Sequence, residues 1–414
     1  MFPPFSRQTW RRAGILLLSL LLIAGVIYSF ALPPVGRFPD EMEYLRLSEN
    51  LRNGPGYSMD GVHLTACRPP GYAFFISAIE SAGGGVVAVR LVQYLLLAAT
   101  VLLVWRFCLK EDRPANLLIV TGLVMLYPVL FYTSATLYPQ TLAAFLFMLV
   151  LTFLVAPARG FVLDLATGLT FGVLILVVPT FLFTLVVVLA VARALKIIEW
   201  RNGILIFVAA SFMIGLWTAR NYAEFHQFVP VASNSGTNFL IGNCENTIPY
   251  GGSGNFDRTH YQQEARALGL DEFQEDRYYR QAAVTWIKTH PGRAIVLYLE
   301  KVANFFNVYN EYAPENKAEV SVWKQAVMAV TYGILLALLA WRLLEMKRFP
   351  LTTHEKLFLA IYVLSAFTSA IFFTRIRLRL PYDYLIIAII AMHLSRRLQS
   401  WLEPAASGDK GATE

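Results

Sequence analysis

Long apolar runs alternate with short polar segments along most of this chain, and two polar stretches are much longer than the others. A helix needs about 20 mostly apolar residues to cross a membrane. On that measure the sequence predicts about ten spans, with nine or eleven as alternatives because Pro128, Pro139 and Pro179 interrupt the longest runs. The predicted spans are roughly 13–32, 84–108, 115–131, 136–156, 161–178, 180–195, 203–218, 322–343, 356–373 and 381–399.

The composition agrees with an all-α polytopic membrane protein. Of the 414 residues, 56% are hydrophobic and only 15% are charged, and the mean hydropathy is +0.51. Soluble domains carry nearer a quarter of charged residues. The first apolar run follows Arg7, Arg11 and Arg12 and ends without a small-residue cleavage site, so we interpret it as an uncleaved span.

The basic residues predict an orientation. With the N-terminus inside, the clusters between spans fall on the cytoplasmic side, whereas the short connections near 127–138 and 178–180 contain no Lys or Arg. Both termini are then cytoplasmic, and two large loops, 33–83 and 218–321, lie outside. The net charge of +7 therefore reflects membrane topology rather than nucleic-acid binding, and it also suits anionic lipid ligands. The clusters are Arg106/Lys110/Arg113, Arg159, Arg193/Lys196/Arg201, Arg342/Lys347/Arg348 and Arg396/Arg397.

These patterns predict one transmembrane domain over residues 1–400 that includes both outer loops. The tail, 401–414, has the composition of a disordered cytoplasmic segment. No internal repeat is visible.

The first outer loop opens with two adjacent carboxylates, Asp40 and Glu41. The run PDEME fits a helix start with Asp40 as N-cap and Glu43 as the capping-box partner. Tyr44, Leu47 and Leu51 then share one face, as in an amphipathic helix on the membrane surface. Spacing alone favours the cap for Asp40, and a catalytic carboxylate at the bilayer surface is the alternative.

Several segments resemble a known family. The motifs PDEMEY, GPGYS and RPPGY in the first outer loop are similar to those of bacterial relatives of protein O-mannosyltransferases and lipid A aminoarabinose transferases (glycosyltransferase families 39 and 83). These are membrane glycosyltransferases of the GT-C class. The resemblance continues, in the same order, through 137–151, 219–243, 277–306 and 377–384. It implies transfer of a sugar from a polyprenyl-phosphate carrier to an acceptor on the outer face.

The resemblance places the catalytic carboxylate at Asp40. A carboxylate can act as general base toward an acceptor hydroxyl. Partial desolvation, and repulsion from Glu41, are expected to raise the pKa of Asp40 toward a useful value. Glu41 would orient the base or the acceptor, and a single displacement would invert the anomeric configuration.

Three arginines in the last outer connection, Arg375, Arg377 and Arg379, are candidates for the donor phosphate. Arg377 and Arg379 match the family's Arg-x-Arg-Leu-Pro pattern, and the alternative is that all three reach out to the interface. Arg68, before Pro-Pro-Gly, is a further phosphate candidate for which a structural role is equally open.

Further candidate substrate-binding residues combine polarity with a position near an outer loop. Arg90 lies within the second span and either serves function or reaches the outer headgroups. Gln140 stands where much of the family has an acid, which weakens any role in binding acceptor or metal. The segment 233–243 offers polar groups for a sugar but is equally a structured turn. The full set is Glu43, Tyr44, Tyr72, Arg90, Gln140, Arg220, Asn221, Asn238 and Asn243.

No cofactor is certain from the sequence. His, Cys and acidic residues form no cluster at metal-ligand spacing, although a divalent ion held by Asp40 or Glu41 remains an alternative. Cys67 and Cys244 fall in the two outer loops, so they either form a disulfide across the site or stay as free thiols.

The expectation is thus a GT-C enzyme in the bacterial inner (cytoplasmic) membrane with a periplasmic active site. Its partners would be the lipid bilayer, a polyprenyl-phosphate sugar donor and a glycolipid, polysaccharide or protein acceptor, with no nucleic acid. A transporter or flippase of lipid-linked saccharides, and a polyprenyl-diphosphate oligosaccharide ligase, are the rival hypotheses. The sequence identifies neither the sugar nor the acceptor.

Overall fold

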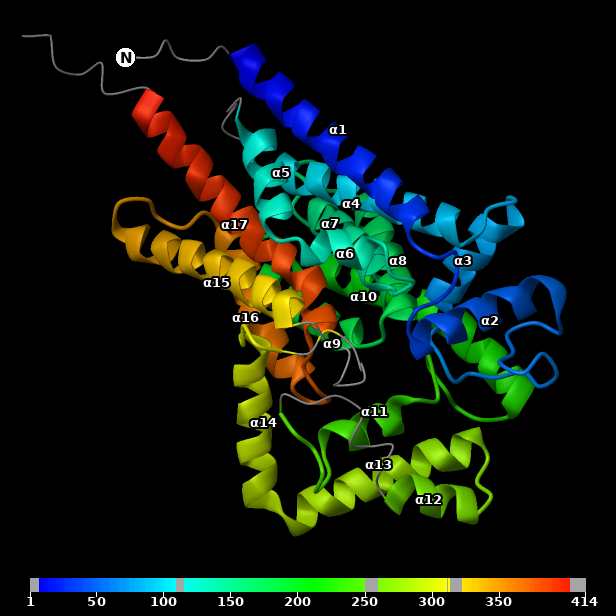
Figure 1. Ribbon diagram of the computed structural model, residues 1–414. Coiled ribbons are helices and arrows are strands. Elements are labelled where there is room, and N and C mark those ends of the chain that lie inside the picture. Colours follow the sequence, from blue (N-terminus) through cyan, green and yellow to red (C-terminus); the bar gives the residue numbers. More distant parts are fainter. Residues whose placement is uncertain (1–6, 109–114, 250–259, 311, 313–321, 403–414) are drawn as a thin grey trace, which may run out of the picture.

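The computed structural model describes residues 7–108, 115–249, 260–310, 312 and 322–402. This part of the chain folds into α-helices α1 to α17 and one short 3-10 helix, Glu345–Lys347 (Figure 1). Within it the only β pairing is an isolated bridge between Ser58 and Leu64. The predicted all-α class is confirmed. The predicted tail lies outside the described residues from position 403 on.

Each predicted span overlaps one apolar helix, and the span 115–131 also runs past Pro128 into the first turn of α6 (Val129–Ser134). By length and composition, α1, α4, α10, α15 and α17 are able to cross a membrane, whereas α5, α7, α8 and α9 are shorter apolar helices. The count of ten spans therefore stays a prediction. The helices are α1 (Arg7–Ala31), α4 (Val86–Cys108), α5 (Asn116–Leu126), α7 (Gln140–Leu154), α8 (Phe161–Val177), α9 (Phe181–Ala194), α10 (Trp200–Phe225), α15 (Val322–Leu344), α16 (Thr353–Ser369) and α17 (Ile376–Leu402).

Proline divides the longest apolar runs at the expected places. Pro128 separates α5 from α6 (Val129–Ser134), and Pro139 immediately precedes α7. Pro179 lies between α8 and α9. Proline lacks the N–H that a continuing helix would need, so each run becomes two helices with a turn between them. One of these turns, 135–139, contributes to the candidate site.

Helix α17 is the core of the bundle. In the apolar 18-residue stretch of α17, 89% of the residues are buried. In the corresponding stretches of α1 and α10 the buried share is 22%. Helix α17 packs against α4, α5, α7, α15 and α16 (Figure 1). The N-terminal end of α17 therefore holds its side chains at a fixed place among the other helices, and Arg377 and Arg379 lie in its first turns.

The polar segments gather at one end of the bundle. The first contains α2 (Pro39–Asn53) and α3 (Pro70–Ser81). The second contains α11 (Ser235–Gly242), α12 (His260–Ala267), α13 (Glu272–Thr289) and α14 (Pro291–Phe305). In Figure 1 the described ends of α1 and α17 nearest the termini lie at the opposite end from α11–α14.

Glu272, at the start of α13, joins the two outer segments. Its carboxylate accepts hydrogen bonds from the Thr65 hydroxyl (2.5 Å) and the Ala66 N–H (2.9 Å) in the first segment. It also accepts one from the Ser233 hydroxyl in the second. The Ser233 N–H donates in turn to the Ala66 carbonyl oxygen at 2.9 Å. The loop that carries Arg68 is thus fixed by residues about 200 positions later in the chain.

Candidate active site

The helix cap at the start of α2 differs from the predicted one. Helix α2 begins at Pro39 with Phe38 as the N-cap residue, so Asp40 is inside the first turn and is not the cap. The third helical position is Glu41, not Glu43, and the Glu41 carboxylate accepts from the Phe38 N–H. Proline at the first helical position explains the shift, since its fixed φ suits a helix start. Asp40 is left available for other partners.

Glu41 accepts hydrogen bonds from backbone N–H groups through both of its carboxylate oxygens. It is fully buried, and its Oε2 accepts from the N–H groups of Arg37 (2.5 Å) and Phe38 (3.4 Å). Its Oε1 accepts from the N–H of Leu137, in the turn before α7, at 2.9 Å. Buried N–H groups require such partners. Glu41 therefore holds the start of α2 against that turn, and the expected role in orienting the acceptor is not supported by these contacts.

Asp40 lies between two arginines from distant parts of the chain. Its Oδ1 accepts from Arg68 Nη2 and its Oδ2 from Arg377 Nη1, both at 2.8 Å. The Asp40 side chain is 18% exposed, so the carboxylate is still reached by solvent. Asp40 and Arg68 are both in the first polar segment and Arg377 is near the end of the chain, and the fold brings both arginines into direct contact with Asp40.

The ion pairs reverse the expected change in the pKa of Asp40. Burial does raise the pKa, but the charges and hydrogen bonds of Arg377 and Arg68 outweigh it and lower the pKa to about 2. The expected raised pKa is wrong for this arrangement. The raised pKa was attributed to repulsion from Glu41, whereas the dominant charges around the Asp40 carboxylate are the two guanidinium groups.

Arg68 is held by more than Asp40. Its Nε donates to Glu43 Oε2 at 2.5 Å, and its backbone carbonyl accepts from the Tyr57 hydroxyl at 2.9 Å. Glu43 thus positions Arg68 instead of capping the helix. Tyr44 is buried and packs edge-on against Tyr72, with ring centroids 5.0 Å apart. Both tyrosines are therefore part of the packed core next to the site.

Two tyrosines near Asp40 were not singled out from the sequence. The guanidinium carbon of Arg377 lies 4.4 Å from the ring centroid of Tyr138, a cation–π distance. Tyr312 lies edge-on to Tyr138, and its hydroxyl donates to Thr133 at 3.0 Å. Tyr138 lies in the motif LYPQ, from which only Gln140 was chosen as a candidate, so this tyrosine could have been selected from the sequence.

Buried polar atoms without a partner mark the same region. They are the hydroxyl of Tyr138, the amide oxygen Oε1 of Gln140 and Nε of Arg377. Buried polar side-chain atoms are normally hydrogen-bonded, so each such atom calls for an explanation. Tyr138 and Arg377 contact each other, and Gln140 begins α7 two residues after Tyr138. These atoms are suited to bind a polar ligand beside Asp40.

Arg379 differs from Arg377 in its surroundings. It is buried, pairs with Asp383 one turn later at 3.1 Å, and donates to the Phe305 carbonyl at 2.8 Å. These partners occupy its guanidinium within the helix bundle. Arg375 is also buried, with its guanidinium 4.8 Å from the Phe373 ring. Of the three arginines in this connection, Arg377 is the one paired with Asp40.

Arg90 and Tyr72 have structural partners. Arg90 is fully buried and donates to the carbonyl oxygens of Pro33 (2.8 Å), Ala135 (3.1 Å) and Val35 (3.2 Å). Of the two alternatives for Arg90, reaching the headgroups is therefore wrong, because these carbonyls fix it inside the protein. The Tyr72 hydroxyl donates to Gln93 at 2.9 Å, and Gln93 donates to the Thr136 carbonyl at 2.7 Å. Both contacts hold the turn before α7.

The candidates in the second outer segment anchor that segment. Arg220 donates to the Thr65 carbonyl at 3.0 Å and stacks over Trp217, with 4.9 Å from guanidinium carbon to ring centroid. Asn221 donates to the Val229 carbonyl at 2.9 Å. The 233–243 segment, expected to be a turn or a sugar-binding loop, forms α11, and Asn238 lies half-buried within that helix.

Lys301 and Asn304, on α14, were missed by the sequence analysis. Lys301 is buried and donates to the carbonyls of Gly242 (2.8 Å) and Phe372 (2.9 Å) and to Asn243 Oδ1 (3.1 Å). Burial lowers the pKa of Lys301 to about 7. Asn304 donates to the Thr374 hydroxyl at 2.9 Å. Together they tie α11 and α14 to the connection before α17.

Cys67 and Cys244 are free thiols, so the structure contains the second of the two expected alternatives. Cys244 is buried in the small core shared by α11, α12 and α13, and its sulfur is 3.4 Å from the Thr247 hydroxyl. Cys67 follows Ala66 and lies beside Thr65 and Arg68. Each thiol is therefore packed within its own segment.

The residues at Asp40 do not fit a divalent ion. Among the described residues, no three His, Cys, Asp or Glu side chains come together as a metal site. Both oxygens of Glu41 accept backbone N–H groups, and both oxygens of Asp40 accept from arginines. Two guanidinium groups at hydrogen-bond distance oppose a further cation at this carboxylate.

Comparison with known proteins identifies the fold of this chain through solved structures. No family model matches the chain, and no curated protein sequence is significantly similar to it. The oligosaccharyltransferase AglB from Archaeoglobus fulgidus, in complex with an inhibitory peptide and a dolichol-phosphate, matches with a TM-score of 0.52 and 13% identity. The match covers 97% of this chain and 52% of AglB, so the chain spans about half the length of that protein.

ArnT from Cupriavidus metallidurans was solved bound to undecaprenyl phosphate and in the apo state. Both structures match with a TM-score of 0.40, at 14% and 12% identity, and cover 94% of this chain and 79% of ArnT. The likeness to AglB, together with apolar helices able to cross a membrane, shows that this chain has the all-helical membrane fold of the GT-C class.

Proposed function

We propose that this chain is a membrane glycosyltransferase that transfers a sugar from a polyprenyl-phosphate donor to an acceptor at the membrane surface. The observation that carries the proposal is the position of Asp40. A partly exposed carboxylate is bound by two arginines at the end of a membrane bundle, and both arginines are suited to phosphate. A base and phosphate-binding cations thus occupy one site.

The proposed chemistry uses these groups in sequence. The donor phosphate binds Arg377 and Arg68 and takes over their hydrogen bonds to Asp40. Burial then acts on the carboxylate with less opposition, so its pKa rises from about 2 and it becomes a better base. Asp40 accepts the proton of the acceptor hydroxyl as that oxygen bonds to the anomeric carbon. The bond from anomeric carbon to phosphate oxygen breaks, and configuration inverts.

The fold supports the same reaction class. AglB was solved with a dolichol-phosphate, which is a polyprenyl-type phosphate lipid. We propose that this chain takes a lipid of that chemistry, with its phosphate at Arg377 and Arg68 and its tail among the spans from α15 to α17. The side chains of Tyr138 and Gln140, with unpartnered polar atoms, would contact the sugar or the acceptor.

The transporter hypothesis fits less well. A transporter needs polar or charged groups that line a path near mid-membrane. Here several buried charges already have partners within the protein: Arg379 pairs with Asp383, Arg342 pairs with Glu355, and Arg90 donates to backbone carbonyls. The accessible carboxylate and its arginines lie at one end instead. The diphosphate ligase is the closer rival, and it differs in releasing a diphosphate carrier.

We further propose that the Asp40 site faces the periplasm across the bacterial inner membrane. The basic clusters place both termini in the cytoplasm. The end of the bundle that carries α11–α14 lies away from the described ends of α1 and α17 (Figure 1). A cysteine introduced near Asp60, in an exposed part of the first outer loop, should react with a membrane-impermeant maleimide in intact spheroplasts.

The deciding experiment measures sugar transfer by purified protein in proteoliposomes. Extracted polyprenyl-phosphate sugars serve as donors, and release of the free carrier phosphate is followed. We expect Asp40→Asn to abolish release. Glu49→Gln, which changes an exposed carboxylate on the same helix, should retain it. Full activity of Asp40→Asn would refute the base assignment. Binding of the donor without any turnover by wild type would favour the transporter.

A further inference from the structure

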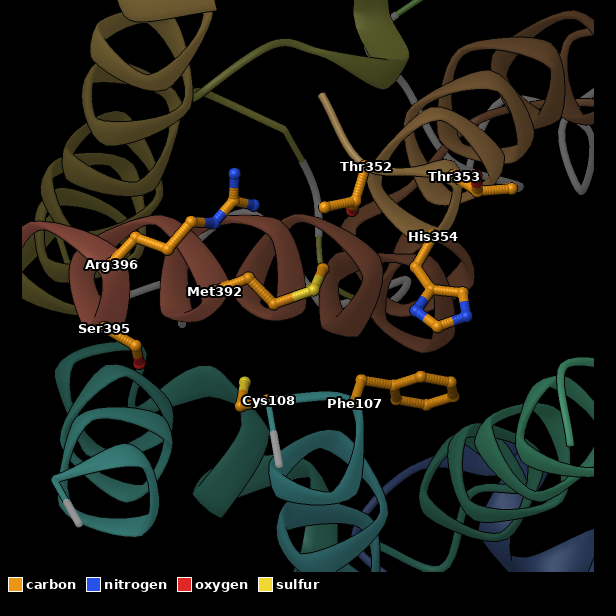
Figure 2. Close-up of a pocket in the computed structure, with 8 residues that line it drawn as sticks. All are labelled: Phe107, Cys108, Thr352, Thr353, His354, Met392, Ser395 and Arg396. Atoms are coloured by element: carbon orange, nitrogen blue, oxygen red, sulfur yellow. The ribbon is translucent and has the colours of Figure 1, made fainter. Parts of the chain in front are cut away.

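A second enclosed site lies far from Asp40. A cavity of about 220 Å³ opens between the C-terminal end of α4, the start of α16 and the last turns of α17 (Figure 2). Its lining includes Thr352 and Thr353 from the start of α16 and Ser395 and Arg396 from α17. Phe107 and Met392 form an apolar wall. None of these residues takes part in the function proposed above.

The cavity is at the other end of the helix bundle. Arg377, which pairs with Asp40, and Arg396, which lines the cavity, are nineteen residues apart on α17. At 1.5 Å per residue the helix rises about 28 Å between them. The hydrocarbon core of a bilayer is about 30 Å thick. The cavity therefore lies at the level of lipid headgroups on the membrane face opposite the Asp40 site.

The start of α16 makes the cavity favourable for an anion. Helix α16 has 17 residues, and N–H groups at a helix start are left without intrahelical partners and carry partial positive charge. Thr352 Oγ1 accepts one of them, the N–H of Glu355, at 3.2 Å. Thr352 and Thr353, at the very start of the helix, line the cavity, so the positive end of the helix faces it.

Ser395 provides an independent indication of a ligand. Its side chain is 3% exposed and lines the cavity, and its hydroxyl has no hydrogen-bond partner among the described residues. A buried hydroxyl without a partner is uncommon and unfavourable. A phosphate oxygen in the cavity would accept the Ser395 O–H.

A guanidinium group lines the cavity. Glu355 is fully buried and pairs with Arg342 through two hydrogen bonds, at 2.8 and 3.2 Å. Arg396 adds a second guanidinium to the same carboxylate at 2.5 Å and also lines the cavity. The Arg396 side chain is thus held at the cavity wall, where its positive charge favours a phosphate.

We propose that this cavity binds the phosphodiester headgroup of a phospholipid from the leaflet opposite the Asp40 site. The phosphate lies between the start of α16, Arg396 and the Ser395 hydroxyl. The glycerol carbons lie against Phe107 and Met392. The site holds α4, α16 and α17 together at this face, and the proposal does not depend on the glycosyltransferase function.

The test measures lipid binding directly. Delipidated protein in detergent is titrated with dioleoyl-phosphatidylglycerol and followed by native mass spectrometry and thermal unfolding. Dioleoylglycerol, which lacks the phosphate, and inorganic phosphate are the comparison ligands. Ser395→Val removes the hydroxyl at similar size, and Arg396→Gln removes the guanidinium charge from the cavity wall. Arg397→Gln is the matched control, since the adjacent Arg397 pairs with Glu345 at 2.6 Å and does not line the cavity.

We expect wild type and Arg397→Gln to bind one phosphatidylglycerol and to unfold at a higher temperature with it. Ser395→Val and Arg396→Gln should each weaken binding by about tenfold, the effect of losing one hydrogen bond to a charged group. If Arg396→Gln fails to fold, Ser395→Val still decides. Equal binding by Ser395→Val and wild type would overturn the proposal, as would equal protection by dioleoylglycerol. Protection by inorganic phosphate but not by phospholipid would overturn the assignment to a lipid.

Discussion

Glu41 and Asp40 are adjacent, yet the structure predicts that their substitution has opposite consequences. Glu41→Ala removes the acceptor of three N–H groups, those of Arg37, Phe38 and Leu137. The Leu137 contact and the shorter of the other two, to Arg37, should dominate. An unsatisfied buried donor costs about 1–3 kcal/mol, so the loss in unfolding free energy is about 3–5 kcal/mol. Glu41→Gln keeps one acceptor oxygen and should lose about half of that.

Asp40→Asn should behave differently. The amide keeps one oxygen acceptor for an arginine but removes the charge between the two guanidinium groups, so the cost to stability is about 2 kcal/mol, as for protonation of Asp40. The carboxylate that we propose as the general base is nevertheless gone. We therefore expect Asp40→Asn to fold and fail in catalysis, and Glu41→Gln to retain turnover per folded molecule.

The assay combines two measurements on the same detergent-purified variants. Thermal unfolding by intrinsic fluorescence gives the change in stability, and carrier-phosphate release per folded molecule gives the chemistry. The opposite pattern would refute this reasoning. If Glu41→Gln unfolds like wild type and has lost transfer, then Glu41 acts in the reaction and its contacts to the backbone are secondary.

Three further predictions concern stability. Ion pairing lowers the pKa of Asp40 to about 2, below its value in the unfolded chain. The ionised carboxylate therefore stabilises the fold by about 2 kcal/mol above about pH 4, and this contribution is lost as the pH falls to 2. Arg68→Gln should reduce that acid-dependent loss in a denaturation series. The pKa of Lys301, about 7, is below its unfolded value, so the unfolded state binds more protons and stability should rise from pH 7 to 10 in wild type but not in Lys301→Met. Gly242→Ala would place a Cβ 1.9 Å from a carbonyl oxygen of the α16–α17 connection and should cost about 1–3 kcal/mol, whereas Gly215→Ala, with open space around it, should leave the melting temperature unchanged.

The helical elements were predictable because apolar length and proline position are local properties. Nine of the ten predicted spans overlap a single helix, the span 115–131 covers α5 and the start of α6, and the breaks fell at the predicted prolines. The pairing of Arg379 with Asp383 was also visible as an i, i+4 spacing, although the arginine was assigned to phosphate instead.

The partners of Asp40 and Glu41 were not predictable in the same way. The identity of the capping carboxylate depends on where α2 begins, and a shift of two residues exchanges the roles of Glu41 and Glu43. The low pKa of Asp40 depends on Arg68 and Arg377 converging from separate segments. Lys301 gave no signal at all, because a lone lysine on a polar helix is ordinary until its acceptors are known.

The ion pair between Asp40 and Arg377 joins residues 337 positions apart. During synthesis Asp40 leaves the ribosome long before Arg377, and α17, which carries Arg377, follows all the other described helices. Until α17 inserts, the Asp40 carboxylate lacks its Arg377 partner, and Arg68 itself awaits Glu272 for its loop to be fixed. The candidate site is thus completed only after α17 has been made. Chains truncated before α17 would contain both polar segments and yet have an incomplete candidate site.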